Sequence, residues 1–202
     1  MPGVSLLLAL ATVLIGPTQP VTNGADVIRA MHARYQGKWY RTLSFVQRAI
    51  YPDGRPEEEW WEAALIAGRL RIDIVPVDSG RTIIYRGDSN YVFNKGTLAQ
   101  AVARRNILAI LGFDVYGQPP ERTIELVKGE GVDLAKVRED RWDGKAAYVI
   151  GGPDHEVWID KDRLLFLKVV QLGAGGAATE ISFNKDELFE TAWKRAGWIP
   201  KP

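Results

Sequence analysis

Short stretches in which apolar and polar residues alternate, separated by tight turns, cover most of the chain after residue 38. The stretch 39–51 places Leu43 and Phe45 on one face and Val46 on the other, because successive strand residues point to opposite sides. Similar stretches follow at 58–66, 70–75, 82–86 and 90–94, and a second group lies at 137–142, 146–151, 156–159, 164–172 and 179–184. Glycine, proline and aspartate punctuate them, and Asp143-Gly144 is a two-residue hairpin signal. This spacing predicts an antiparallel meander.

Three segments carry a helical pattern instead. Residues 25–36 have apolar side chains at Ile28, Met31 and Tyr35, and Thr22 or Asn23 is available as an N-cap. Residues 106–113 form a short apolar segment. Pro119-Pro120 opens a helix over 121–128, since proline is tolerated in the first helical turn. The order of helix, strands, central helices and strands predicts an α+β fold in one domain.

The N-terminus contains an unbroken apolar run at 4–15, which ends in Gly16-Pro17. About a dozen residues are too few to span a bilayer, but they match the apolar region of a secretory signal. We therefore expect residues 1–24 to be a signal peptide and residues 25–202 to be the mature domain, soluble in the periplasm or otherwise exported. The alternative is a buried N-terminal helix or strand, because no basic residue precedes the run and no A-x-A cleavage site follows it.

The composition excludes several classes of function. The 26 basic and 25 acidic residues nearly cancel, and no basic block stands out, which argues against nucleic acid as a partner. The absence of cysteine excludes disulfides, thiolate metal sites and cysteine nucleophiles. The chain has 7 Trp, 7 Tyr and 6 Phe, and such a set of aromatics suits either an ordinary core or an apolar binding cavity.

No arrangement of residues predicts catalysis. The two histidines, His32 and His155, have no cysteine or further histidine to complete a nitrogen- or sulfur-rich metal site. The adjacent acids Glu57-Glu58-Glu59 point to alternate faces of a strand, so spacing alone does not pair them. The serines lie in no nucleophile elbow, and the glycines make no phosphate-binding loop. We expect no enzymatic activity, no metal and no cofactor; a hydrolase with an unrecognised carboxylate pair is a weak alternative.

Several strands are apolar on both faces, as at Ile83-Ile84, Trp60-Trp61 and the run 164–170. An antiparallel sheet needs only one buried face. The sheet therefore needs cover on both sides, or else one side lines a ligand cavity. The pattern leaves open whether the helices seal a dry core or cover a pocket of lipid size.

Several short phrases of the sequence resemble those of a known family. The phrases AxxVIxxMHxRYxGKWYRTLSFVQ at 25–47, GRLRIDI at 68–74, YRGDSNYVF at 85–93, LLFLKVV at 164–170 and GWIP at 197–200 are similar to the LolA-like group. These are exported bacterial proteins related to the periplasmic carrier of outer-membrane lipoproteins. The resemblance implies a curved, unclosed antiparallel β half-barrel with helices covering its apolar concave side. It also implies acyl-chain binding, with Arg41 as the nearest candidate for an arginine that holds the lid.

In such proteins a phrase like GWIP commonly leads into a further strand, so the resemblance leaves two alternatives: either the sequence is truncated, or the domain at 25–202 lacks its last strand and has an exposed edge. We further expect the segment 106–128 to be a mobile lid.

These observations predict a periplasmic carrier or binding protein for a hydrophobic ligand. The expected ligand is the acyl chains of a lipid or lipoprotein, in outer-membrane lipoprotein sorting. We expect a monomer with inner- or outer-membrane partner proteins. The alternative is a non-enzymatic envelope interaction or signalling module with a filled core. The residues expected to line the apolar cavity are Trp39, Arg41, Leu43, Phe45, Trp61, Leu70, Ile72, Ile84, Phe93, Ile107, Leu111 and Phe166.

Overall fold

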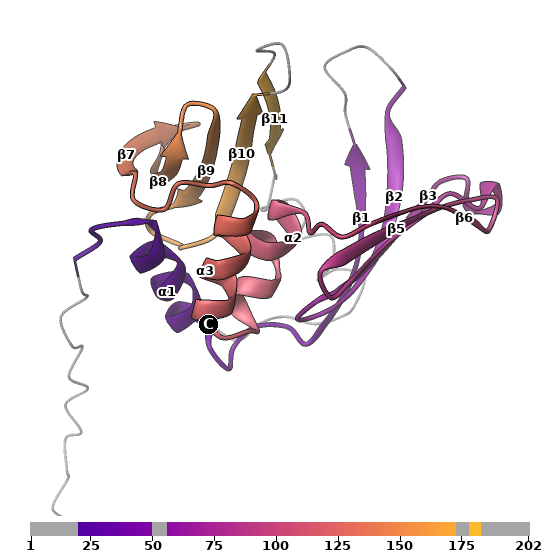
Figure 1. Ribbon diagram of the computed structural model, residues 1–202, viewed down its shortest axis with the longest axis horizontal. Coiled ribbons are helices and arrows are strands. Elements are labelled where there is room, and N and C mark those ends of the chain that lie inside the picture. The colour runs from indigo at the N-terminus through magenta and orange to yellow at the C-terminus, as the bar shows by residue number, and fades with distance from the viewer. Residues whose placement is uncertain (1–19, 50–55, 173–177, 183–202) are drawn as a thin grey trace, which may run out of the picture.

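The computed structural model describes residues 20–49, 56–172 and 178–182, which form an α+β fold with two antiparallel sheets (Figure 1). The first sheet has six strands in sequence order: β1 (Thr42–Ala49), β2 (Glu58–Leu65), β3 (Arg69–Ile74), β4 (Thr82–Arg86), β5 (Ser89–Asn94) and β6 (Thr97–Val102). The second has five strands in the order β11 (Ala178–Ser182), β10 (Phe166–Leu172), β9 (His155–Asp160), β8 (Lys145–Gly152) and β7 (Val137–Trp142). Over these described residues, neither sheet closes on itself.

Helix α1 (Gly24–Tyr35) precedes the first sheet along the chain, and α2 (Ile107–Gly112) and α3 (Pro120–Gly129) connect the two sheets; in space the three helices lie together between the sheets (Figure 1). Two 3₁₀ turns, Val77–Ser79 and Asp114–Tyr116, complete the described elements. Buried apolar residues from all three helices and from both sheets form one core. The predicted α+β class with unclosed antiparallel sheets and covering helices is thus confirmed, with the strands divided between two sheets.

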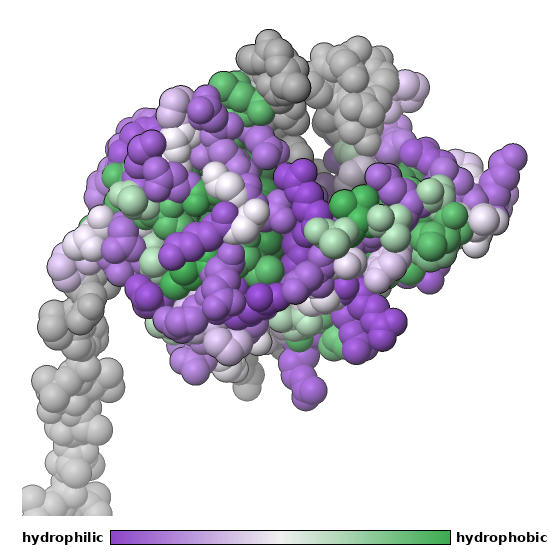
Figure 2. Space-filling model, in the orientation of Figure 1, coloured by the Kyte–Doolittle hydropathy of each residue, from purple (hydrophilic) through white to green (hydrophobic). Residues whose placement is uncertain are grey.

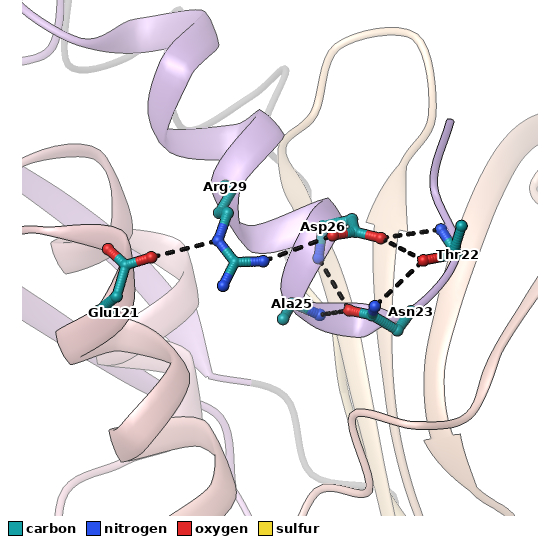
Figure 3. Close-up of polar contacts among 6 residues, drawn as sticks. All are labelled: Thr22, Asn23, Ala25, Asp26, Arg29 and Glu121. Carbon is teal, nitrogen blue, oxygen red and sulfur yellow. Dashed lines mark hydrogen bonds and ion pairs between the residues drawn. The ribbon is translucent and has the colours of Figure 1, made fainter. Parts of the chain in front are cut away.

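Helix α1 begins where the capping pattern predicts. The Asn23 side chain accepts hydrogen bonds from the backbone amides of Ala25 and Asp26, and Asp26 accepts from the Thr22 hydroxyl at 2.7 Å (Figure 3). These bonds satisfy amides that the first helical turn would otherwise leave without partners. Arg29 then reaches Glu121 of α3, so the first turns of α1 and α3 are joined on the surface (Figure 3).

The turns follow the sequence signals closely. Asp143 and Gly144 both have positive φ angles, 50° and 74°, as a tight hairpin between β7 and β8 requires. Strand β6 was not predicted, because its sequence TLAQAV lacks an apolar alternation and all but its last residue is exposed. It forms the edge of the first sheet, where little apolar surface needs burial.

Several expectations lie partly or wholly outside the described residues. Most of the expected signal peptide falls in 1–19, and the segment around GWIP falls in 183–202. Within the described part of the chain, no helix combines the length and apolar character needed to cross a membrane.

The hairpin between β5 and β6 is held against Gly80, which yields a test of the fold. Gly80 has φ of 65°, and a Cβ there would lie 2.6 Å from the Gly96 amide nitrogen. Gly87 has φ of 58° with nothing within 4 Å, so Gly87→Ala incurs only the left-handed strain, about 1 kcal/mol. We expect Gly80→Ala to lose a further ~1–3 kcal/mol, since backbone atoms must move. Urea unfolding of both variants measures this difference; equal losses would contradict the close packing.

Candidate ligand-binding site between the first sheet and the helices

The first sheet turns one face toward the helices, and we call it the inner face. The strand register aligns two rows across it, Leu43–Ala64–Leu70–Tyr85 and Phe45–Glu62–Ile72–Ile83. Apart from Glu62, the residues of both rows belong to the core or pack against it. The inner face is therefore a nearly continuous apolar surface with one carboxyl group in it.

A central segment, residues 105–117, covers this face. It contains α2 and the 3₁₀ turn at Asp114–Tyr116, and Ile110, Leu111 and Val115 have no exposure to solvent. The ring of Phe113 stacks on Phe45 of β1 with 5.7 Å between centroids. The segment therefore meets the inner face through an aromatic contact at the row that contains Glu62.

The helices are attached more closely to the second sheet than to the first. Helix α1 lies beside β8 and helix α2 lies beside β10, and both strands belong to the second sheet. Within the helical part of the fold, His32 Nδ1 of α1 lies 3.1 Å from the carbonyl oxygen of Val115 in the central segment. The helices therefore form a layer, the helical layer, that packs against the second sheet, and the first sheet packs on the other side of it mainly through side chains.

A hydrogen bond to Asp114 fastens the central segment to the first sheet, and a buried ion pair inside the segment holds Asp114 in place. Arg105 pairs with Asp114, and both side chains are almost fully buried. Asp114 also accepts a hydrogen bond from the backbone amide of Gly68, at the β2–β3 turn, with 2.7 Å between nitrogen and oxygen. Burial raises the pKa of the Asp114 carboxyl, against the opposing effects of the Arg105 charge and the Gly68 amide. We call these three groups the latch.

Little free space remains beside the latch. A small pocket of about 10 Å³ is lined by residues that include Ala64, Leu70, Tyr85, Arg105 and Phe113. This is roughly the volume needed for one water molecule, far below the ~300 Å³ of a small ligand site. Beside the latch, the inner face therefore has no room for a ligand unless the first sheet and the helical layer separate.

Glu62 is the exception to this apolar packing. Glu62 is 6% exposed, and its Oε1 atom has no hydrogen-bond partner among the described residues. Burial raises the pKa of the Glu62 carboxyl to about 8. A carboxyl group that is buried without a partner is costly in either protonation state, and most of that cost falls on the charged form.

The structure brings together seven of the residues expected to line a cavity and separates the others. Leu43, Phe45, Leu70, Ile72, Ile107, Leu111 and Phe166 are buried in one core, where they contact protein. Trp39 packs at the edge of this core, with 3.9 Å between the centroids of its ring and that of Tyr116. Arg41 is exposed, and it meets the sheet through its backbone oxygen, which accepts from the Ile66 amide.

Trp61, Ile84 and Phe93 lie on the opposite, outer face of the first sheet. The register pairs Trp61 with Val46 and with Asp73, which puts it out of phase with Phe45 and Glu62. Trp61 is 52% exposed and Leu98 is 51% exposed. Figure 2 shows apolar residues among hydrophilic ones over the strands at the right of the view. One cavity cannot be lined from both faces, so these three residues do not share a site with Phe45.

Sequence reasoning missed Glu62, Arg105 and Asp114. The period-two pattern of β2 contains a signal for Glu62, since it has the same phase as the core residue Ala64. No local signal pairs Arg105 with Asp114. Within the described residues, no group of three or more His, Cys, Asp or Glu side chains could hold a metal ion.

Comparisons with known proteins assign neither a family nor a function to this chain. No family model matches the chain, and no curated protein matches it. Among solved structures, a LolA superfamily protein from Nitrosomonas europaea is similar, with 15% identity over 78% of this chain and 75% of that chain. Its TM-score of 0.40 carries no conclusion about family or function.

The two phenylalanines on opposite faces test the placement of the core. Phe45→Ala should lower the free energy of unfolding by about 3–5 kcal/mol, because a buried ring leaves a cavity. Phe93→Ala, on the half-exposed outer face, should cost clearly less. Chemical denaturation compares the two variants. A larger loss for Phe93→Ala would mean that the inner and outer faces have been exchanged.

Glu62 should make stability depend on pH. Its pKa is raised in the folded protein from 4.5 to about 8. The native state then binds more protons than the unfolded chain between these values, so the free energy of unfolding falls as pH rises through this window. The loss is on the order of a few kcal/mol and is complete once the pH exceeds the folded-state pKa. Glu62→Gln should remove this dependence.

The measurement is denaturant unfolding of the wild type, Glu62→Gln and the control Glu57→Gln across the pH range from acidic to mildly alkaline. Glu57 is exposed and makes a surface ion pair with Arg48. Other titrating groups cancel in the comparison. Parallel curves for wild type and Glu62→Gln would show that the carboxyl group is solvated.

Proposed function

We propose that this protein binds an apolar chain between the inner face of its first sheet and the helical layer. The observation that carries this proposal is the composition of that interface. It is apolar across β1 to β4, and the first sheet is fastened there by the latch and by side-chain packing. The cover over the sheet includes α2, a helix of six residues. Such a short helix has little stability of its own and depends on its contacts.

The proposed ligand is the acyl chain of a lipid or lipoprotein, and the proposed setting is outer-membrane lipoprotein sorting outside the cytoplasm. Support for the setting comes from the apolar run at 4–15 and from the sequence phrases described above. We propose a binding role rather than a catalytic one, because the inner face offers apolar surface and a single carboxyl group. Acid–base catalysis would ordinarily need a second group that is positioned with it.

A second candidate function is favoured by the filled interface. The pocket beside the latch has only about 10 Å³, as expected for a module that uses a dry core to present its outer surface to a partner. The two candidates differ in one physical property. A carrier must part its first sheet from the helical layer at a modest free-energy cost, and an interaction module need not.

Weakening the latch should therefore raise ligand affinity if the protein is a carrier. We suggest the double variant Arg105→Met/Asp114→Asn, which removes both charges without leaving one buried alone. The asparagine side chain could still accept a hydrogen bond from the Gly68 amide, but this bond to the first sheet is weaker with a neutral acceptor than with a carboxylate. Because the closed state competes with the ligand, destabilising it by about 1.4 kcal/mol should tighten binding about tenfold. A fatty acid with a solvatochromic fluorophore reports binding, and amide exchange of 105–117 reports opening.

The matched control is Arg122→Met/Asp88→Asn. This exposed pair has 2.7 Å between nitrogen and oxygen. It joins α3 to the β4–β5 turn of the first sheet, as the latch joins the central segment to the β2–β3 turn. Surface ion pairs contribute little, so affinity should hardly change. If the fluorescent fatty acid binds neither the wild type nor the latch variant, the carrier proposal fails and the interaction module is preferred.

A further inference from the structure

We propose that Glu62 is the polar recognition group of this site and that the ligand carries a cationic amino group on its apolar chain. The inference rests on the proposed function, because it assumes that the inner face receives a ligand. Its starting point is that the side chain of Glu62 makes no hydrogen bond or ion pair with any described residue. A carboxyl group in this position weakens the closed protein, since it is largely removed from water and no protein group compensates for that loss. A ligand that pairs with it would relieve that cost.

The position of Glu62 makes it available to a chain on the inner face. In the strand register it lies between Phe45 of β1 and Ile72 of β3. Phe45 in turn stacks on Phe113 of the central segment. Separation of the first sheet from the helical layer would therefore expose Glu62 in the middle of an apolar surface. A chain lying there would place its methylene groups on the apolar neighbours and one polar group at the carboxyl.

The charges nearby favour a cation over an anion. Arg105 is matched by Asp114, and Arg81 is matched by Glu58 at the far end of β2, with 2.9 Å between nitrogen and oxygen. Both pairs are neutral as units, so ionised Glu62 would leave the inner face with one uncompensated negative charge. A carboxylate or phosphate head would meet like charge, whereas an ammonium group would supply the missing counter-charge.

A cation is also preferred over a neutral partner such as an alcohol or an ester. Hydrogen bonds between ionised groups are about twice as strong as neutral ones, and the advantage grows in a site that excludes water. The protonated carboxyl can bind a neutral group, but a glutamine side chain could do so equally well. Glu62→Gln therefore separates the two kinds of recognition.

Binding of an ammonium group should release a proton. The Glu62 carboxyl has a pKa of about 8 in the closed protein, so it is mostly protonated at neutral pH. Pairing with a cation favours the carboxylate. The proton leaves Glu62 for the buffer, the amine remains protonated, and no covalent bond changes. Calorimetry at neutral pH in two buffers of different ionisation enthalpy should detect nearly one proton released per ligand.

Three twelve-carbon competitors test the proposal directly. Dodecylamine, dodecanol and dodecanoate, each below its micellar concentration, would displace the fluorescent fatty acid from wild-type protein, Glu62→Gln and the exposed control Glu57→Gln. We expect dodecylamine to bind about tenfold more tightly than dodecanol in the wild type and in Glu57→Gln. In Glu62→Gln that preference should disappear, along with the proton release.

The outcomes distinguish this inference from the proposed function. If dodecanol or dodecanoate displaces as well as dodecylamine in the wild type, Glu62 is not a cation-recognition group, although the protein still binds chains. A preference for the amine that persists in Glu62→Gln would also overturn the inference, since the charge would then be recognised elsewhere. If neither the fluorescent fatty acid nor any competitor binds, the proposed function itself fails.

Discussion

Ile110, Leu111 and Val115 lose all contact with solvent because they lie in the layer that both sheets share. The strands on either side of this layer belong to different sheets, so no ladder of backbone hydrogen bonds joins the two halves of the fold over the described residues. Their union depends on side-chain packing around residues 105–117 and on the latch. Apolar packing of this kind is strong but not directional. The hydrogen bond from the Gly68 amide to Asp114 adds direction, because it forms in one alignment of the central segment and the β2–β3 turn, and Arg105 holds the Asp114 carboxylate in place for it.

The parts of the fold that sequence predicts are those set by local chemistry. The Asn23 cap, the Asp143-Gly144 hairpin and the proline at the start of α3 each depend on a few neighbouring residues. The division into two sheets depends on which strands pair, and no local pattern predicts that β6 and β7 do not pair with each other. Strand β6 itself was missed because an exposed edge strand needs no apolar alternation.

The candidate site was harder to predict because it depends on register and on distant contacts. Trp61 and Trp60 are adjacent, and only the pairing of β1 with β2 decides which of them faces the helices. A shift of one residue exchanges the two faces completely, and this is why Trp61, Ile84 and Phe93 were expected in the wrong place. Glu62 was overlooked because charged residues in a strand are usually solvated. Its burial follows from the same register that places Phe45 and Ile72 inside.

The two buried acids of this interface differ in their partners, and this difference explains how the interface could open. Asp114 has a cation and a backbone amide, so its negative charge is part of what holds the central segment. Glu62 has neither, so it opposes closure once it ionises. A buried ion pair contributes little net stability, because desolvation offsets most of its attraction. The interface is therefore held mainly by apolar contacts, which an alkyl chain can replace one for one. An apolar ligand alone would only replace apolar contacts with similar apolar contacts. A ligand that also pairs with Glu62 would gain an interaction that the closed protein lacks.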